Sequence, residues 1–263
     1  MLAHKISILA GLFFLSLFIT AFILPSVNII SSRLGLLDQP NKRKIHRLPL
    51  VRIGGLAMAS GYCLSLLTLK YFVDFSIFDF SDSINQLLFL VIGLSLLHFF
   101  IGLIDDLYNL SPFIRLISQV GLASFGWSKG FMIATLNFDD FGFNLPDIIL
   151  SRWLSLPITI FFVVGLINSI NWLDGLDGLS GGVSTISVIG FLIISFQTSN
   201  FFSAALSISL LGAMIGFLFY NSYPAKILMG DGGSYFLGLT FAFLGIISCN
   251  DNSEIAGNSF CME

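Results

Sequence analysis

Charged side chains are scarce in this sequence. Lysine, arginine, aspartate and glutamate together make up 10% of the 263 residues, whereas an ordinary soluble domain contains about 25%. Hydrophobic residues make up 56% of the chain. So small a share of charge excludes water as the main solvent of this chain and indicates a membrane protein.

Cysteine is also rare, and clusters that mix basic with aromatic residues do not occur. Cys63 falls inside an apolar run, and Cys249 and Cys261 lie near the end with no paired spacing. This pattern supports neither a disulfide framework nor a thiolate metal site. The net charge is only −3, and we expect no nucleic-acid partner.

Long apolar runs, by contrast, are abundant. About 20 apolar residues cross the hydrocarbon core of a bilayer, and eight candidate runs are bounded by charge or by Gly, Pro and Asn clusters. They extend from Ile6 to Ile29, Ile53 to Phe72, Gln86 to Ile104, Phe113 to Trp127, Trp153 to Ile170, Gly182 to Phe196, Phe201 to Phe219 and Tyr235 to Ser248. The fourth and sixth runs are short for a full span. The expected fold is an all-α polytopic membrane protein, with one domain over residues 1–248 and a polar tail over 249–263.

Positive charge is concentrated in the first loop. Six Lys and Arg residues lie between Arg33 and Arg52, whereas the loop from Val73 to Ser83 contains three Asp and no cation. Because cytoplasmic loops retain Lys and Arg, the first loop is predicted to be cytoplasmic. Counting spans alternately then places the loops around Asp105, Asn171 and Asn221 on the same side.

One loop on the opposite side has a different pattern. The segment from Phe131 to Ile149 contains two short β-like runs about a turn that includes Asp139 and Asp140. Such runs on either side of a turn are typical of a hairpin. We therefore expect a small extracytoplasmic β-hairpin.

The densest polar segment follows the fifth apolar run. It contains Asn168, Asn171 and Asp174, which are three residues apart and would share a face on a continuing helix. Gly175 and Gly178 allow the backbone to approach a ligand closely. Oxygen ligands of this type suit Mg²⁺, which takes one or two carboxylates together with substrate phosphates. The alternative is a polar turn that only connects two helices.

Two further loops contain acidic residues at helix ends. Asp105 and Asp106 end the third run, and Arg115 begins the next helix. Adjacent carboxylates at a span end need a cation, a metal or water as a partner. The pair is therefore a candidate for a functional site, and the alternative is a solvated cap at the membrane interface. Asp231 lies at the start of the last helix, where backbone amides point toward an anion.

The first loop is more basic than a topological signal requires. Its density of cations attracts polyanions or anionic head groups. His46 lies within this loop and Arg52 at its end. His46 is a candidate for phosphate binding or proton transfer, and the alternative is that it does neither.

In this order, the motifs resemble those of the polyprenyl-phosphate N-acetylhexosamine-1-phosphate transferases of glycosyltransferase family 4. That family includes the phospho-MurNAc-pentapeptide translocase and the enzymes that initiate enterobacterial antigen and teichoic acid. The resemblance rests on Asp105-Asp106, on Asn168 through Asp177-Gly-Leu, on Asn221-x-x-Pro-Ala through Met-Gly-Asp231, and on Arg43-Lys44-x-His46 through Gly54-Gly55. It covers approximately residues 5 to 248.

The resemblance implies a reaction and a cellular location. Family members use Mg²⁺ to transfer an N-acetylhexosamine 1-phosphate from a UDP-sugar, here UDP-GlcNAc by preference, to undecaprenyl phosphate, and they release UMP. This step would initiate cell-wall or surface polysaccharide synthesis. The implied location is the bacterial plasma membrane, with the active site facing the cytoplasm, and the family also admits a homodimer.

The resemblance also implies roles for individual residues. Asn171 and Asp231 would bind the metal, with Asp174 close by. Asp105 would be the base toward the lipid phosphate, supported by Asp106. The substrate-binding residues implied by the motifs are Asp177, Gly175, Leu176, Arg115, His46, Arg52 and Asn221.

Two features depart from the family pattern. Family members usually continue through further spans and a histidine-rich cytoplasmic loop, and nothing corresponding follows Ser248. We therefore expect a truncated member, and the alternative function is an inactive homologue that retains the fold. Leu228 stands where many relatives have Phe, which would alter stacking on uracil.

A cation or proton transporter is a third hypothesis, but the acids of a transporter should lie near the bilayer midplane, whereas the acids of this chain lie at span ends.

Overall fold

The structure, a computed structural model, describes residues 2–38, 49–72, 82–136 and 148–249. These residues contain eight α-helices and four two-residue strands. The helices are α1 (Leu2–Arg33), α2 (Gly55–Phe72), α3 (Asp82–Tyr108), α4 (Pro112–Ser128), α5 (Arg152–Leu173), α6 (Leu179–Gln197), α7 (Phe201–Asn221) and α8 (Gly230–Cys249).

Each of the eight predicted spans corresponds to one of these helices. Among the described residues, six helices are long and apolar enough to cross a membrane, namely α1, α3, α5, α6, α7 and α8. The fourth run was predicted to be short, and α4 has 17 residues, whereas α6 reaches 19 residues and qualifies as a span. The chain is therefore a polytopic, all-α membrane protein, as predicted.

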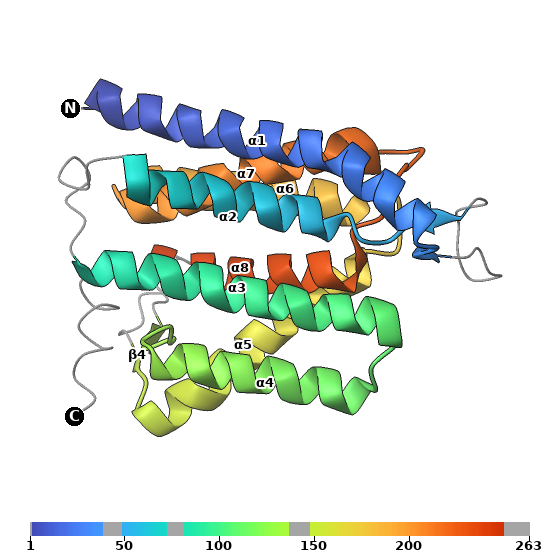
Figure 1. Ribbon diagram of the computed structural model, residues 1–263. Helices are drawn as coiled ribbons and strands as arrows, with labels where there is room; N and C mark the ends of the chain where they lie inside the picture. The colour runs from blue at the N-terminus through green and yellow to red at the C-terminus, as the bar shows by residue number, and fades with distance from the viewer. Residues whose placement is uncertain (1, 39–48, 73–81, 137–147, 250–263) are drawn as a thin grey trace.

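Helices α7 and α8 form the buried centre of the bundle. Helix α8 packs against α3 and α5, and α7 packs against α1 and α6. Figure 1 shows α8 beside α3, between the layer of α1, α2, α6 and α7 and the pair α4 and α5. The outer helices expose large apolar side chains such as Phe22 and Phe161, as expected where lipid replaces water as the neighbour.

The polar connections lie at one end of this bundle. The links from α3 to α4 and from α7 to α8 lie at the same end as the strands that follow α1, and β4 lies at the opposite end (Figure 1). This arrangement agrees with the prediction that the acidic and basic loops share one face. The helices therefore position the candidate site at a single end of the molecule.

Two short antiparallel strand pairs complete the fold. The pair of β3 (Thr135–Leu136) and β4 (Ile148–Ile149) is the predicted hairpin, although its second strand lies later in the chain than the sequence indicated. Residues 141–145, expected to form that strand, lie outside the described residues. The pair of β1 (Leu37–Asp38) and β2 (Leu50–Val51) was not predicted, and it closes the basic loop at the polar end.

Candidate active site

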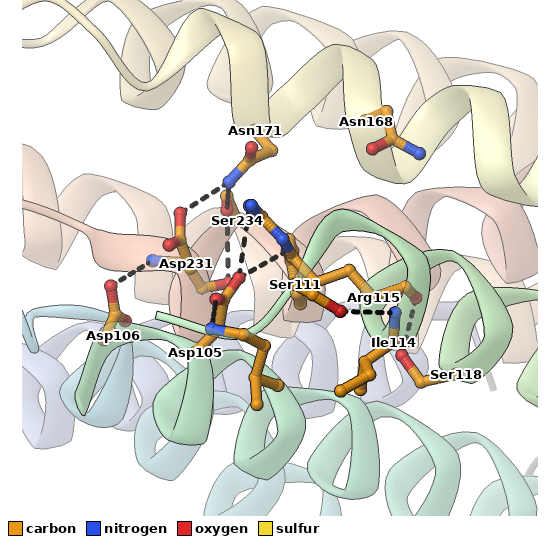
Figure 2. Close-up of polar contacts among 12 residues, drawn as sticks. Asp105, Asp106, Ser111, Ile114, Arg115, Ser118, Asn168, Asn171, Asp231 and Ser234 are labelled. Carbon is orange, nitrogen blue, oxygen red and sulfur yellow. Dashed lines mark hydrogen bonds and ion pairs between the residues drawn. The ribbon is translucent and has the colours of Figure 1, made fainter. Parts of the chain in front are cut away.

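Polar residues from four segments meet at the polar end of the bundle. They come from the last turn of α3, the link from α5 to α6, the segment after β2 and the first turn of α8. Figure 2 shows Asp105, Asp106, Asn171 and Asp231 gathered around the start of α8. The folded chain thus assembles most of the predicted site from segments that are far apart in sequence.

The first backbone amides of α8 are bound by carboxylates. The amides of Asp231 and Gly232 donate to Asp106 at 2.9 and 3.0 Å, and the Gly230 amide donates to Asp174 at 3.2 Å. The first amides of a helix lack partners within the helix, and negative charge is favoured there. The anion predicted at this helix start is therefore supplied by the protein's own Asp106 and Asp174.

Glycine is required where the chain turns into α8. Gly230 has a φ of +79°, in the left-handed region that glycine adopts without steric cost. A Cβ at this position would collide with the Arg52 carbonyl oxygen and lie 2.7 Å from Asp106 Oδ2. The absence of a side chain therefore allows three segments to approach the same point.

Asn171 and Asp231, the predicted metal ligands, are in direct contact although they are 60 positions apart. The Asn171 side-chain amide donates to Asp231 Oδ1 at 2.7 Å and to Ser234 Oγ at 2.9 Å (Figure 2). Among the described residues, no group of three or more acidic, histidine or cysteine side chains is arranged to hold a metal. A cation at this position would need further oxygen atoms from water or substrate.

Arg52 connects two of the acidic residues. Its Nε lies 3.2 Å from Asp106 Oδ1, and its Nη2 lies 3.0 Å from Asp231 Oδ1. Backbone pairing fixes this segment beside the link from α7 to α8, because the Leu228 amide donates to the Val51 carbonyl at 2.8 Å. The structure therefore places Arg52, predicted to bind substrate, on the carboxylates of the site.

Asp105 is buried and bound on both oxygens. The Leu110 amide donates to Oδ1 at 2.8 Å, and the Tyr235 hydroxyl donates to Oδ2 at 2.8 Å. Arg115 Nη1 lies 3.4 Å from the same Oδ2, close to the predicted base. Tyr235 was not singled out in the sequence, but it lies four residues after Asp231, and residues at this spacing are neighbours on a helix surface.

Asp174 caps the end of α5 and is largely enclosed. The Ser180 hydroxyl donates to its Oδ1 at 2.8 Å, and the Gly230 amide donates to its Oδ2. Burial raises the pKa of Asp174 to about 7, and these two donors act in the opposite direction. A nearby cation would also favour the carboxylate form, because opposite charge lowers the pKa of an acid.

Asp177 and Asn221 join the two polar links to each other. The Ala225 amide donates to Asp177 Oδ2 at 3.0 Å. The Gly178 amide donates to Asn221 Oδ1 at 3.1 Å, and Asn221 Nδ2 donates to the Ile227 carbonyl at 3.0 Å. Both side chains thus hold backbone in place, and a contact with substrate stays a prediction for each.

Asn168 does not join the cluster. Its side-chain amide donates to Gln119 of α4 at 2.8 Å, and Figure 2 shows it apart from Asn171 along α5. A step of three residues falls about 60° short of a full helical turn, so Asn168 and Asp174 differ by about 120° around the axis. The expectation that all three polar residues share one face is therefore wrong for Asn168.

The remaining predicted residues lie at the margin of the site or outside the described residues. Gly175 and Leu176 are exposed on the link from α5 to α6, and His46 lies in residues 39–48, which the structure does not describe. A cavity of about 280 Å³ opens beside Arg52 and Asp106, with Leu36 and Asn109 on its walls. This volume lies just below the range of about 300–1,000 Å³ that is typical of small-molecule sites.

Comparisons with known proteins agree on one family. The matching family model is described as glycosyl transferase family 4 and covers residues 88–249. A probable undecaprenyl-phosphate N-acetylglucosaminyl 1-phosphate transferase of Bacillus subtilis is 31% identical over 236 residues, which are 89% of this chain and 62% of the relative. A phospho-N-acetylmuramoyl-pentapeptide-transferase of Halalkalibacterium halodurans is 32% identical over 70% of this chain and 58% of its own length.

A third relative comes from Mycobacterium tuberculosis. It is a decaprenyl-phosphate N-acetylglucosaminephosphotransferase, 31% identical over 85% of this chain and 56% of its own length. The chain thus spans about three fifths of the length of the curated relatives it matches.

Proposed function

The chain belongs to glycosyl transferase family 4, and from this premise we propose that it transfers an N-acetylhexosamine 1-phosphate from a UDP-sugar to undecaprenyl phosphate and releases UMP. The observation that carries the proposal is the contact of Asn171 with Asp231 at 2.7 Å, beside Asp106 and Asp174 at the start of α8. Acidic side chains from three segments and Arg52 from a fourth thus gather at one point, where they could hold a cation against a diphosphate.

The choice of sugar and acceptor rests on the relatives. The names of the Bacillus and Mycobacterium relatives specify N-acetylglucosamine and a polyprenyl phosphate, and that of the Halalkalibacterium relative specifies N-acetylmuramoyl-pentapeptide. All three names describe transfer of a phosphosugar. We therefore propose UDP-GlcNAc as the donor.

Asp231 and Asn171 are suited to bind Mg²⁺. Mg²⁺ is bound through one or two carboxylates, retains several waters and takes substrate phosphates, so it does not need a closed cage of protein ligands. Asp231 would supply a carboxylate oxygen, and Asn171 would supply its amide oxygen once that side chain turned, because its nitrogen faces Asp231 in the structure. Both oxygens are hard donors. Mg²⁺ bound there would neutralise the charge on the diphosphate.

Two arginines supply fixed positive charge around the same point. Arg52 lies beside the cavity, and Arg115 lies beside Asp105. Phosphoryl transfer depends mainly on positioning and on neutralising charge. Arg52 is therefore proposed to contact the sugar-bearing phosphate, and Arg115 the lipid phosphate.

The reaction is proposed to proceed in one step rather than through an aspartyl phosphate. An oxygen of the lipid phosphate forms a bond to the phosphorus that carries the sugar. The bond from that phosphorus to the bridging oxygen breaks, and UMP departs with this oxygen. Asp105 accepts any proton that the lipid phosphate carries. Asp106 holds the start of α8 by accepting hydrogen bonds from the backbone amides of Asp231 and Gly232.

The experiment is a transfer assay on the purified chain in detergent. Radiolabelled UDP-GlcNAc and undecaprenyl phosphate should yield a lipid-linked GlcNAc diphosphate and an equal amount of UMP with Mg²⁺, and neither product with EDTA. Parallel reactions with other UDP-amino sugars identify the preferred donor. The absence of lipid product from every donor would contradict the proposed function.

A further inference from the structure

Tyr235 is a buried tyrosine in the second turn of α8. Its side chain is 1% exposed, and its hydroxyl donates to Asp105 Oδ2 at 2.8 Å. Tyr235 is the fourth residue after Asp231, so both residues face the polar end from neighbouring turns of one helix. The same helix therefore presents both the candidate metal ligand and a donor to the candidate base.

The hydroxyl is the best-placed donor to this oxygen of Asp105. Arg115 Nη1 lies 3.4 Å from Oδ2, beyond the usual range of about 2.7–3.2 Å for an N–H···O hydrogen bond. The other oxygen, Oδ1, is bound by the Leu110 amide at 2.8 Å. Without the Tyr235 hydroxyl, Oδ2 would retain only the longer ion pair with Arg115.

The ring of Tyr235 is itself held in place. His98 stacks on it, with ring centroids 5.0 Å apart and planes 26° apart. His98 lies seven residues before Asp105 on α3, two turns along the same face. Helix α3 therefore provides both the carboxylate and the ring that packs against its donor.

We propose that Tyr235 is a positioning residue that holds the Asp105 carboxylate in the orientation required to act on the lipid phosphate. This inference rests on the proposed function, in which Asp105 is the base. A hydrogen bond to a charged group is stronger than one between neutral groups. Loss of this bond should reduce turnover without preventing either substrate from binding.

The test is Tyr235→Phe, which removes the hydroxyl and keeps the ring that stacks on His98. We expect kcat to fall by about 10- to 100-fold, the range that loss of a hydrogen bond to a charged group would cause. KM for UDP-GlcNAc, whose proposed contacts do not include Arg115 or Asp105, should stay within about twofold. The Tyr235→Phe, Asp105→Asn double variant should be no slower than Asp105→Asn alone, because the hydroxyl would then have no carboxylate base to position.

Tyr62→Phe is the matched control. Tyr62 is also fully buried, packs against Phe236 of α8, and its hydroxyl has no hydrogen-bond partner among the described residues. Removing that hydroxyl should leave kcat unchanged. An unchanged kcat in Tyr235→Phe, or rate losses that multiply fully in the double variant, would overturn the proposal.

A measurement without turnover separates this proposal from the proposed function. If the unaltered chain forms no lipid product, thermal unfolding of the same variants in detergent still tests the contact. The combined Tyr235→Phe, Asp105→Asn variant should lower Tm by less than the sum of the two single changes. The shift in Tm of the combined Tyr62→Phe, Asp105→Asn variant should equal the sum of its two single shifts. Additive shifts for the first pair would overturn the inference.

Discussion

At the scale of single residues, Asp231 has contacts from three directions. Asn171 and Arg52 donate to its Oδ1, and its amide donates to Asp106. A residue in this position affects both the proposed Mg²⁺ site and the start of α8. Substitutions around it should therefore separate metal binding from folding.

Loss of either proposed metal ligand should raise the Mg²⁺ requirement. We expect Asp231→Asn and Asn171→Ala to increase the Mg²⁺ concentration for half-maximal transfer by about tenfold or more. A Mg²⁺ titration of the transfer rate measures this effect. Asn168→Ala is the matched control, because Asn168 lies one turn away on α5 and donates to Gln119. Equal Mg²⁺ requirements in Asn171→Ala and Asn168→Ala would contradict the assignment.

Replacement of Arg52 should make the fold more responsive to Mg²⁺. Arg52 lies between Asp106 and Asp231, and without its charge the two carboxylates repel each other. Arg52→Gln should lower Tm, and Mg²⁺ should raise the Tm of this variant more than that of the unaltered chain. Arg52→Lys should fall between them, because an ammonium group lacks the fork that reaches both acids. The same Mg²⁺ shift in all three proteins would refute this prediction.

Sequence motifs predicted several of the polar residues that the structure brings together, but not all of their contacts. Asn171, Asp174 and Asp231 could be predicted because such residues are rare in an apolar chain and stand at span ends. Asn168 could not be placed, because its contact depends on where α4 lies around α5. The bond from Tyr235 to Asp105 depends on the packing of α3 against α8, which the sequence of neither helix specifies.

At the scale of elements, the site depends on how closely α3 approaches α8. A Cβ on Gly102 of α3 would lie 2.5 Å from the Asp231 carbonyl oxygen and 2.6 Å from Gly232 Cα. The atoms that this Cβ would meet belong to the backbone of α8, which cannot move away as a flexible side chain can. The position of the Asp106 carboxylate on the α8 amides therefore requires glycine at this point of α3.

Gly102→Ala should consequently harm both stability and activity. Overpacking of this kind costs about 1–3 kcal/mol, so we expect a lower Tm in detergent and a lower transfer rate. Gly93→Ala is the control in the same helix, since a Cβ there meets no atom within 4 Å. Alanine is favoured over glycine within a helix, so Gly93→Ala should leave Tm unchanged or raise it. The prediction fails if both variants have the same Tm.

The helices themselves could be predicted well, because apolar runs of span length have few alternative structures in a bilayer. The pairing of β1 with β2 could not be predicted. Its strands have two residues each, too few for any alternation of polar and apolar residues to be visible. Strand β4 of the hairpin also has only two residues, and the strand expected over 141–145 lies outside the described residues.

At the scale of the whole molecule, the proposed site should face the cytoplasm. The end of α1, where β1 follows, and the link from α7 to α8 lie at one end of the bundle, and β4 lies at the other (Figure 1). Tyr223 is 83% exposed at the first end, and Ile149 is 81% exposed at the second. These two positions therefore report the orientation of the chain in a membrane.

Single cysteines at these positions test the orientation. In a chain whose three native cysteines are replaced by serine, Tyr223→Cys should react with a membrane-impermeant maleimide in inside-out vesicles but not in intact spheroplasts. Ile149→Cys should react in spheroplasts only. The reverse pattern would place the proposed site on the outer face of the membrane.

The attachment of α8 to earlier parts of the chain also has a consequence for biosynthesis. Asp106 is synthesised 125 residues before Asp231, its backbone partner, and Asn171 is synthesised 60 residues before it. Until the ribosome has produced α8 and the helix has entered the bilayer, Asp106 has no α8 amides to accept from, Asn171 has no Asp231 carboxylate to donate to, and α3 lacks its neighbour α8. The candidate site therefore cannot assemble during translation until α8, the last of the described helices, has been made.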